Sequence, residues 1–357
     1  METIQNTKEK RIKSEYERAQ AKKWLVLLVL FVALILLVLI SVFVGQANLS
    51  FADTIKGFFG AGSDKNVRIV WYIRMPRILA AIVVGFGLAI SGHVMQTTLQ
   101  NPLASPSSLG VSQAAVFGAN LAIVLGAGSF GGTASTVLNV NNPYVVAVVA
   151  FCFSLLGILA VVFISKIKNF SPVTVILLGV AATGLFSALT TLVQYAASDQ
   201  VLSAAVYWSF GDLSRASYQK IAIISACVFP SFIVFFLLRW KYNAIQSGDE
   251  VAKSLGVRIS GIRVVSLLLS SLITAVCVSF VGVIGFVGIV CPQLLKRFVG
   301  TDTRFLLPAS GLGGAVLLVL SDIIARIVVP GMNLPVGAVT AILGTPIFVY
   351  VLLRKEK

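Results

Sequence analysis

The segment A-I-Q-S-G-D-E-V-A-K-S-L-G-V, residues 244–257, is the clearest polar interruption in the second half of an otherwise apolar chain. Ser247 is followed three residues later by Glu250, a capping-box spacing that predicts the start of a helix. Asp249 and Glu250 then lie in the first turn, where the positive end of the helix dipole favours acidic side chains. Gly256 supplies a left-handed stop. The segment therefore predicts a helix of about two turns.

The side chains of this short helix form two further patterns. Asp249 and Lys253 are four residues apart in the favourable acid-before-base order. Val251 and Leu255 share one face, and because so short a helix is marginal alone in water, we expect that face to dock on another structure. Two interpretations follow: a capped turn between two membrane spans, or a surface helix on which another protein acts.

The composition indicates a polytopic membrane protein. Of 357 residues, 57% are hydrophobic and only 11% are charged, whereas soluble domains carry about 25% charged residues. The net charge of +15 suggests nucleic-acid binding at first. The cations lie at the ends of apolar segments, however, so we expect contact with membrane lipid and none with nucleic acid. The four cysteines lie in apolar runs without ligand-like spacing and are expected to be buried hydrophobic residues.

Apolar segments predict an all-α integral membrane protein with about ten transmembrane helices. A basic cytoplasmic tail is expected at 1–23, lying on anionic lipid, then the transmembrane domain at 24–354 and a cytoplasmic end at 355–357. The expected spans are 24–45, 78–96, 110–127, 144–165, 172–196, 219–240, 260–281, 284–299, 305–328 and 335–354. An even number places both termini on one side. Most of the 28 Lys and Arg residues then fall on that side, which predicts that it is cytoplasmic.

Two connecting regions have distinctive sequences. Residues 46–75 are expected to leave the membrane and to include a short amphipathic piece at the interface. The loop at 97–110, T-T-L-Q-N-P-L-A-S-P-S-S-L-G, is uncharged and contains two prolines. Such a loop at membrane depth is tolerated only where it is buried in protein or lines a cavity, so it is a tight turn or part of a translocation gate. His93, just before it, is more often a packing residue than a proton or ligand site.

No sequence motif for catalysis or nucleotide binding is found. Within the expected spans the only acid is Asp322, four residues before Arg326. A proton-coupled carrier usually has several intramembrane acids, so the energy for any transport is expected to come from a separate ATPase. A secondary carrier without an ATPase remains the alternative, and an integral-membrane enzyme is disfavoured.

Several motifs together resemble the permease subunits of type II ABC importers for iron-siderophores, haem and vitamin B12. The similarity extends from about residue 68 to the C-terminus. The matching pieces are R-M-P-R-I-L-A-A at 74–81, S-G-H-V-M-Q at 91–96, N-P-L-A-S-P at 101–106, S-L-G-V at 254–257, G-T-D-T-R at 300–304, S-D-I-I-A-R at 321–326 and L-P-V-G-A-V-T-A-I-L-G-T-P-I-F at 334–348.

The resemblance implies an assembly in the bacterial inner membrane. Each permease subunit would have ten helices. The assembly would also contain a second permease subunit (identical or paralogous), two ABC ATPases and an external substrate-binding protein. ATP and Mg would be bound by the ATPases, so this chain would need no cofactor and would not be an enzyme. The expected cargo is a ferric siderophore, the commonest in the family, with haem or cobalamin as alternatives.

The resemblance also implies roles for three groups of residues. The segment 244–257 would be the coupling helix, which contacts the ATPase through Ser247, Asp249, Glu250, Val251, Lys253, Leu255 and Gly256. Arg74, Arg77 and Arg326 would pair with glutamates of the binding protein, or alternatively extend to lipid headgroups. Gate residues would be Asn101, Pro102, Ser105, Pro106 and Ser107, together with the 165–172 loop.

The sequence departs from the family pattern at three positions. Gln293 and Thr303 stand where the family usually has histidines, and Asn333 stands where it usually has an acid. The missing histidines argue against a metal-ligand role at those positions.

Overall fold

The computed structural model describes residues 2–45, 49–126, 143–329 and 332–353, and these residues are almost entirely helical. This confirms the all-α fold. Ten helices in the described residues correspond to the ten expected spans: α1 (Glu2–Phe43), α4 (Met75–Thr98), α5 (Val111–Gly126), α6 (Pro143–Ser165), α7 (Pro172–Tyr195), α9 (Tyr218–Leu237), α12 (Ile259–Val281), α13 (Val287–Val299), α14 (Thr303–Ile327) and α15 (Val336–Leu353). Shorter elements connect them: α2 (Phe51–Phe58), α3 (Asp64–Arg68), α8 (Asp199–Ser209), α10 (Arg239–Gln246) and α11 (Asp249–Ser254).

Seven helical stretches in the described residues are long and apolar enough to cross a membrane, fewer than the ten full spans expected. Two other apolar helices, α5 and α15, are shorter. At the position of the span expected at 284–299 lies α13. Its 13 residues are only about 20 Å long, whereas the hydrocarbon core is about 30 Å thick. The cause is a backbone break. Gly282 and Phe286 both have positive φ, so the chain leaves helical geometry between α12 and α13.

The region before α4 also differs from the expectation. The amphipathic piece forms α2, and Ser50 caps it by accepting a hydrogen bond from the Asp53 amide. The chain then becomes helical again at residue 64 rather than after 75, and runs as one stretch of 35 residues to Thr98. A π-helical turn, Ile69–Arg74, precedes Pro76 in this stretch. The wider turn places Pro76 at the start of a new α-helical segment, where its missing N–H is tolerated.

Glycine contacts bring the central helices together. A Cβ on Gly92 of α4 would lie 1.8 Å from the carbonyl oxygen of Gly288 in α13. A Cβ on Gly85 of α4 would lie 2.4 Å from the carbonyl oxygen of Gly314 in α14. Small residues allow such close approach of helix backbones in membranes. Helix α4 therefore crosses both α13 and α14 at backbone contact, and these helices form the centre of the bundle together with α12 and α9.

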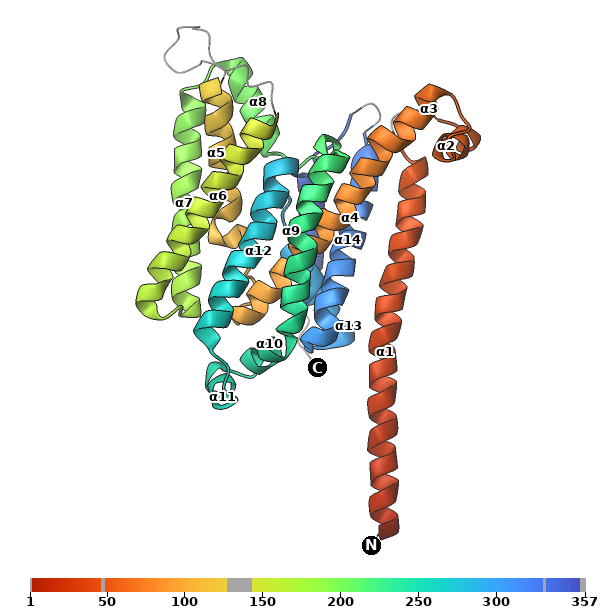
Figure 1. The fold of residues 1–357 in the computed structure, drawn as a ribbon, viewed down its shortest axis with the longest axis vertical. Helices are drawn as coiled ribbons and strands as arrows, with labels where there is room; N and C mark the ends of the chain where they lie inside the picture. Colours follow the sequence, from red (N-terminus) through yellow and green to blue (C-terminus); the bar gives the residue numbers. More distant parts are fainter. Residues whose placement is uncertain (1, 46–48, 127–142, 330–331, 354–357) are drawn as a thin grey trace.

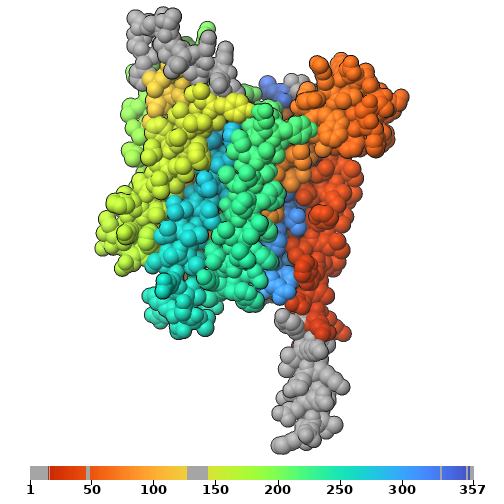
Figure 2. All heavy atoms as spheres, in the orientation of Figure 1, coloured from red at the N-terminus to blue at the C-terminus, as the bar shows by residue number. Residues whose placement is uncertain are grey.

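The other helices are arranged around this centre (Figure 1). Helices α5, α6, α7 and α8 form one side of the bundle, and α1, α2 and α3 form the opposite side. Helix α1 continues in a straight line beyond the bundle, so the N-terminal segment is helical and continuous with the helix of the first expected span. The space-filling view shows α11 at the end of the bundle away from α2 and α3 (Figure 2).

Candidate functional site

The segment 244–257 forms a bend between two short helices, not one helix with a capping box. Ser247 ends α10, and its hydroxyl donates back to the Asn243 carbonyl. Gly248, with φ of +112°, then turns the chain into α11. Because Ser247 is the C-terminal cap of α10, it does not cap α11, and the capping box expected from its spacing to Glu250 is wrong.

The expected stop at the end of α11 is confirmed. Gly256 adopts a φ of +77°. Its amide donates to the Lys253 carbonyl, and the Val257 amide donates to the Ala252 carbonyl, both at 2.9 Å. These two bonds form a Schellman motif, which satisfies the last carbonyls of the helix. The glycine thus fixes where the exposed helix ends and where the chain returns to α12.

Helix α11 presents an apolar face that none of the described residues covers. Val251 and Leu255 are 46% and 67% exposed, whereas Ala252 is buried. Within the described part of the chain, Val251 and Leu255 therefore do not dock on another structure. Beside them is a groove of about 500 Å³, lined by Trp240, Lys241, Ala244, Leu255, Gly256, Val257, Arg258 and Ile262. The end of the bundle therefore offers an apolar surface with basic residues beside it.

Helix α10 fixes this surface to the bundle. Tyr242 is fully buried, and its hydroxyl lies 2.9 Å from that of Ser266 on α12. Burial raises the pKa of Tyr242, which keeps the phenol neutral. Asn243 donates to the Asp302 carboxylate and accepts from the Thr303 amide, both at 2.8 Å. The exposed α11 is consequently attached to a firmly packed neighbour.

Asp249 faces inward rather than toward Lys253. Its two carboxylate oxygens accept hydrogen bonds from Nη2 of Arg263, each at 2.9 Å. Arg263 lies in the first turns of α12 and is 4% exposed. Sequence reasoning missed this residue, because it reads as one more cation near a span end. One feature of the sequence could have indicated it: Arg263 lies in the first turns of an apolar helix, and that helix follows a turn that contains acidic residues.

The N-P-L-A-S-P loop is only partly folded into the protein, because Ala104 and Ser105 are buried whereas Pro102 and Leu103 are exposed. The Oδ1 atom of Asn101 accepts from the Leu103 amide at 2.9 Å, which closes a tight turn. Ser105 is buried and exchanges hydrogen bonds with Ser108. The hydroxyls of Ser107 and Ser112 lie 2.9 Å apart. The tight turn is therefore present and the loop also lines cavities, while its role as a gate stays a prediction.

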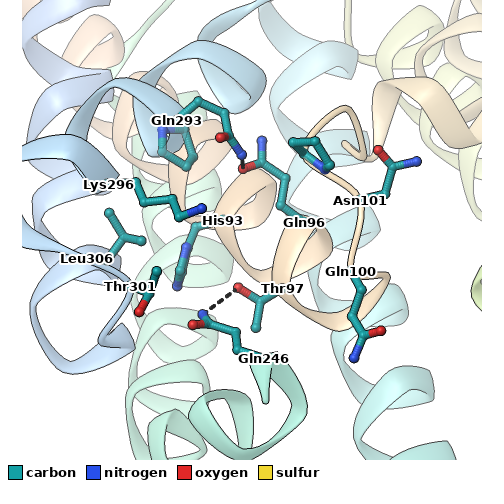
Figure 3. Close-up of a pocket in the computed structure, with 12 residues that line it drawn as sticks. His93, Gln96, Thr97, Gln100, Asn101, Gln246, Gln293, Lys296, Thr301 and Leu306 are labelled. Atoms are coloured by element: carbon teal, nitrogen blue, oxygen red, sulfur yellow. Dashed lines mark hydrogen bonds between the residues drawn. The ribbon is translucent and has the colours of Figure 1, made fainter. Parts of the chain in front are cut away.

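One of these cavities has a volume of about 310 Å³, and most of the residues that line it are of polar types (Figure 3). Asn101 and Pro102 of the loop contribute to it, with residues of α4, α10 and α13. Gln293 donates to Gln96 at 2.7 Å across its wall. His93 is buried beside it, and its Nε2 atom has no hydrogen-bond partner among the residues that the structure describes. The remaining loop residues, Ser105, Pro106 and Ser107, line a smaller cavity of about 40 Å³ with residues of α12 and α13.

The three arginines expected to face outward are buried. Arg77 Nε lies 2.6 Å and Arg326 Nη2 lies 2.9 Å from the two carboxylate oxygens of Asp322. Arg74 donates to the Val42 carbonyl at 2.6 Å. Asn333 accepts a hydrogen bond from Arg77. All three side chains are thus buried with partners in their own chain, which differs from the outward-facing position expected, and their docking on a binding protein stays a prediction.

Replacing Asp322 by alanine is expected to lower the free energy of unfolding by about 3 kcal/mol, because two buried guanidinium groups would lose their counter-ion. Thermal unfolding of the detergent-solubilised chain measures this. Asp64→Ala is the control, since Asp64 is exposed at the same end and its removal should cost no more than about 0.5 kcal/mol. Equal effects of the two substitutions would contradict a stabilising role for the buried cluster.

The described residues include no group of three or more His, Cys, Asp or Glu side chains placed to hold a metal ion. All four cysteines are unpaired. Cys277 and Cys291 are buried as expected, but Cys152 is exposed on the outside of the bundle.

Comparison with known proteins gives one consistent result. The model of the FecCD transport family matches residues 33–354. A Methanocaldococcus jannaschii protein named as an ABC transporter permease is 43% identical over 97% of this chain and 99% of its own. The hemin transport system permease protein HmuU of Yersinia pestis is 34% identical over 92% of this chain and 95% of its own length. A metal-chelate type ABC transporter, solved in an inward-facing conformation, has a TM-score of 0.79 at 29% identity and covers 93% of this chain and all of its own. The chain therefore belongs to the FecCD transport family and is the permease of an ABC importer.

Proposed function

We propose that this permease carries a ferric siderophore into the cytoplasm as part of an assembly with a second permease subunit, two ABC ATPases and an extracytoplasmic binding protein. The observation that carries this proposal is the uncovered apolar face of α11 beside its groove. An apolar surface of this kind, with polar residues around it, is typical of a protein contact. It lies at the end expected to be cytoplasmic, where an ATPase would be found.

In the proposed cycle, the loaded binding protein docks at the opposite end of the bundle. Movement of the ATPases then shifts α10 and α11. The two permease subunits rock against each other, so that access to the pathway alternates between the two sides of the membrane. The loops at 97–110 and 165–172 would form the cytoplasmic gate. Residues of the first loop line two cavities, which supports this role.

The cargo is proposed from chemistry shared among relatives. One relative is named for hemin and the solved structure for a metal chelate. Both descriptions concern a metal held by an organic ligand, which agrees with a ferric siderophore as cargo. Haem is a second candidate, supported by the similarity to the hemin permease over nearly the whole chain.

Uptake by cells tests the cargo. Cells lacking this protein would be complemented with it and offered radiolabelled iron as hydroxamate siderophore, catecholate siderophore or haem, with labelled cobalamin in parallel. We expect uptake of one ferric siderophore to be restored. Restoration by haem or cobalamin alone would contradict the siderophore assignment but keep the import function. Failure with all four, despite correct insertion of the protein, would contradict the proposal.

A further inference from the structure

We propose that Arg263 is the positioning residue that transmits movement of α11 to both loops of the cytoplasmic gate. Three segments, distant in sequence, meet at this one buried side chain. Its Nη2 atom binds Asp249 of α11, its Nε atom donates to the Thr98 carbonyl at 3.1 Å, and its Nη1 atom reaches the Phe170 carbonyl at 3.5 Å. The inference rests on the proposed function, because it assumes that an ATPase moves α11.

The two carbonyls that Arg263 contacts lie in the two gate loops. Thr98 is the last residue of α4 and lies three residues before Asn101, where the N-P-L-A-S-P stretch begins. Phe170 lies in the turn between α6 and α7. The last carbonyls of a helix have no partner within it, so the donor on Arg263 satisfies one of them at Thr98. Figure 1 shows the lower ends of α4 and α12 together, with α11 below them.

These two loops contain three of the four non-glycine residues with positive φ in the described part of the chain, the fourth being Phe286. Gln100, Asn169 and Phe170 have φ of +48°, +50° and +55°, a conformation that residues other than glycine rarely adopt. Strained residues of this kind persist only when surrounding contacts hold them. Arg263 holds the Phe170 carbonyl. Gln100 is held by α10 and α11, since its Nε2 atom donates to the Ile245 carbonyl at 2.7 Å and reaches Asp249 at 3.3 Å.

An arginine suits this position because of its shape. The guanidinium is planar, permanently charged and presents several donors in fixed directions, so one side chain can bind three segments at once. Lysine offers a point charge on a flexible stem. The Arg263 side chain is 5% exposed and that of Asp249 34% exposed, so the pair is anchored inside the bundle and reaches outward to α11. Displacing α11 should therefore move Arg263 and the loop ends with it, because separating the pair would leave a buried charge unpaired.

The experiment measures gate movement directly. Leu103, 49% exposed at the tip of the loop, would be replaced by cysteine in a chain also carrying Cys152→Ser. The permease would be reconstituted with its ATPase, and the rate of reaction with a water-soluble maleimide would be compared with and without ATP and vanadate. We expect the rate to change at least about fivefold in the otherwise native chain.

In the Arg263→Ala variant the maleimide rate should be nearly independent of nucleotide, while the complex still hydrolyses ATP. Arg263→Lys should restore part of the response. Asp249→Ala changes only the half-buried end of the pair, so it tests the link even if Arg263→Ala does not fold. The double variant should lose no more of the nucleotide response than either single variant, since both substitutions break the same ion pair. Arg68→Ala, an exposed arginine at the other end of the bundle, is the control and should keep the full response.

A nucleotide-dependent rate that persists in both Arg263→Ala and Asp249→Ala would overturn the inference and leave the importer function intact. Absence of any nucleotide response in the native chain, together with absence of ATP-dependent uptake, would contradict the proposed function itself.

Discussion

Replacing Leu255 by aspartate is expected to abolish import, with uptake falling at least about 100-fold. Leu255 is 67% exposed and lines the groove beside α11, so the substitution should not disturb the fold of the permease. Within the assembly the new carboxylate would be buried against the ATPase without a partner. Burying an unpaired charge costs several kcal/mol, and each 1.4 kcal/mol corresponds to about tenfold in an equilibrium.

Two measurements check this result. Co-purification of the ATPase with the permease reports whether the subunits still bind each other, and uptake by complemented cells reports import. Leu255→Met is the matched control because it keeps an apolar side chain of similar volume, and we expect it to retain most of the activity. If Leu255→Asp supported normal uptake, α11 would not be the contact through which the ATPase acts.

Replacing Gly92 by alanine is expected to destabilise the bundle by more than about 4 kcal/mol, so that little folded protein accumulates. The added Cβ would lie 1.8 Å from the Gly288 carbonyl oxygen, and that atom belongs to a helix backbone that cannot move aside alone. Helices α4 and α13 would have to separate. The amount of folded chain recovered in mild detergent and its unfolding temperature measure this effect.

Two other glycines provide a graded comparison. A Cβ at Gly288 would approach the Leu88 carbonyl oxygen at 2.8 Å, so Gly288→Ala should destabilise the bundle less than Gly92→Ala. A Cβ at Gly184 would meet nothing within 4 Å, so Gly184→Ala should be neutral or slightly stabilising, as alanine favours a helix over glycine. Equal stability of all three variants would contradict the close crossing of α4 and α13.

The sequence predicts well those features that depend on local pattern and on solubility in lipid. Apolar length and composition locate the helices, and Gly256 marks the end of α11, because a left-handed stop is a property of the few residues around it. The motifs that resemble the FecCD family extend over most of the chain, so the sequence alone indicates the family.

The sequence does not predict features that depend on tertiary contacts. Ser247 and Glu250 have the spacing of a capping box, but Gly248 between them turns the chain, so Ser247 is the C-terminal cap of α10 and not the N-cap of α11. Helical spacing pairs Asp249 with Lys253, although Arg263 offers two hydrogen bonds from a site shielded from water. The burial of the arginine cluster is not visible in the sequence, because the partners of Arg74 and Arg77 lie on α1 and α14, far away along the chain.

Uptake into vesicles is the decisive test of ATP-driven import. The permease would be reconstituted with its ATPase, and accumulation of a radiolabelled ferric siderophore presented with the binding protein would be followed with ATP, without ATP and with a non-hydrolysable analogue. We expect accumulation only when ATP is hydrolysed and only when the ATPase is present. Accumulation by the permease alone would show a secondary carrier and would contradict import driven by an ATPase.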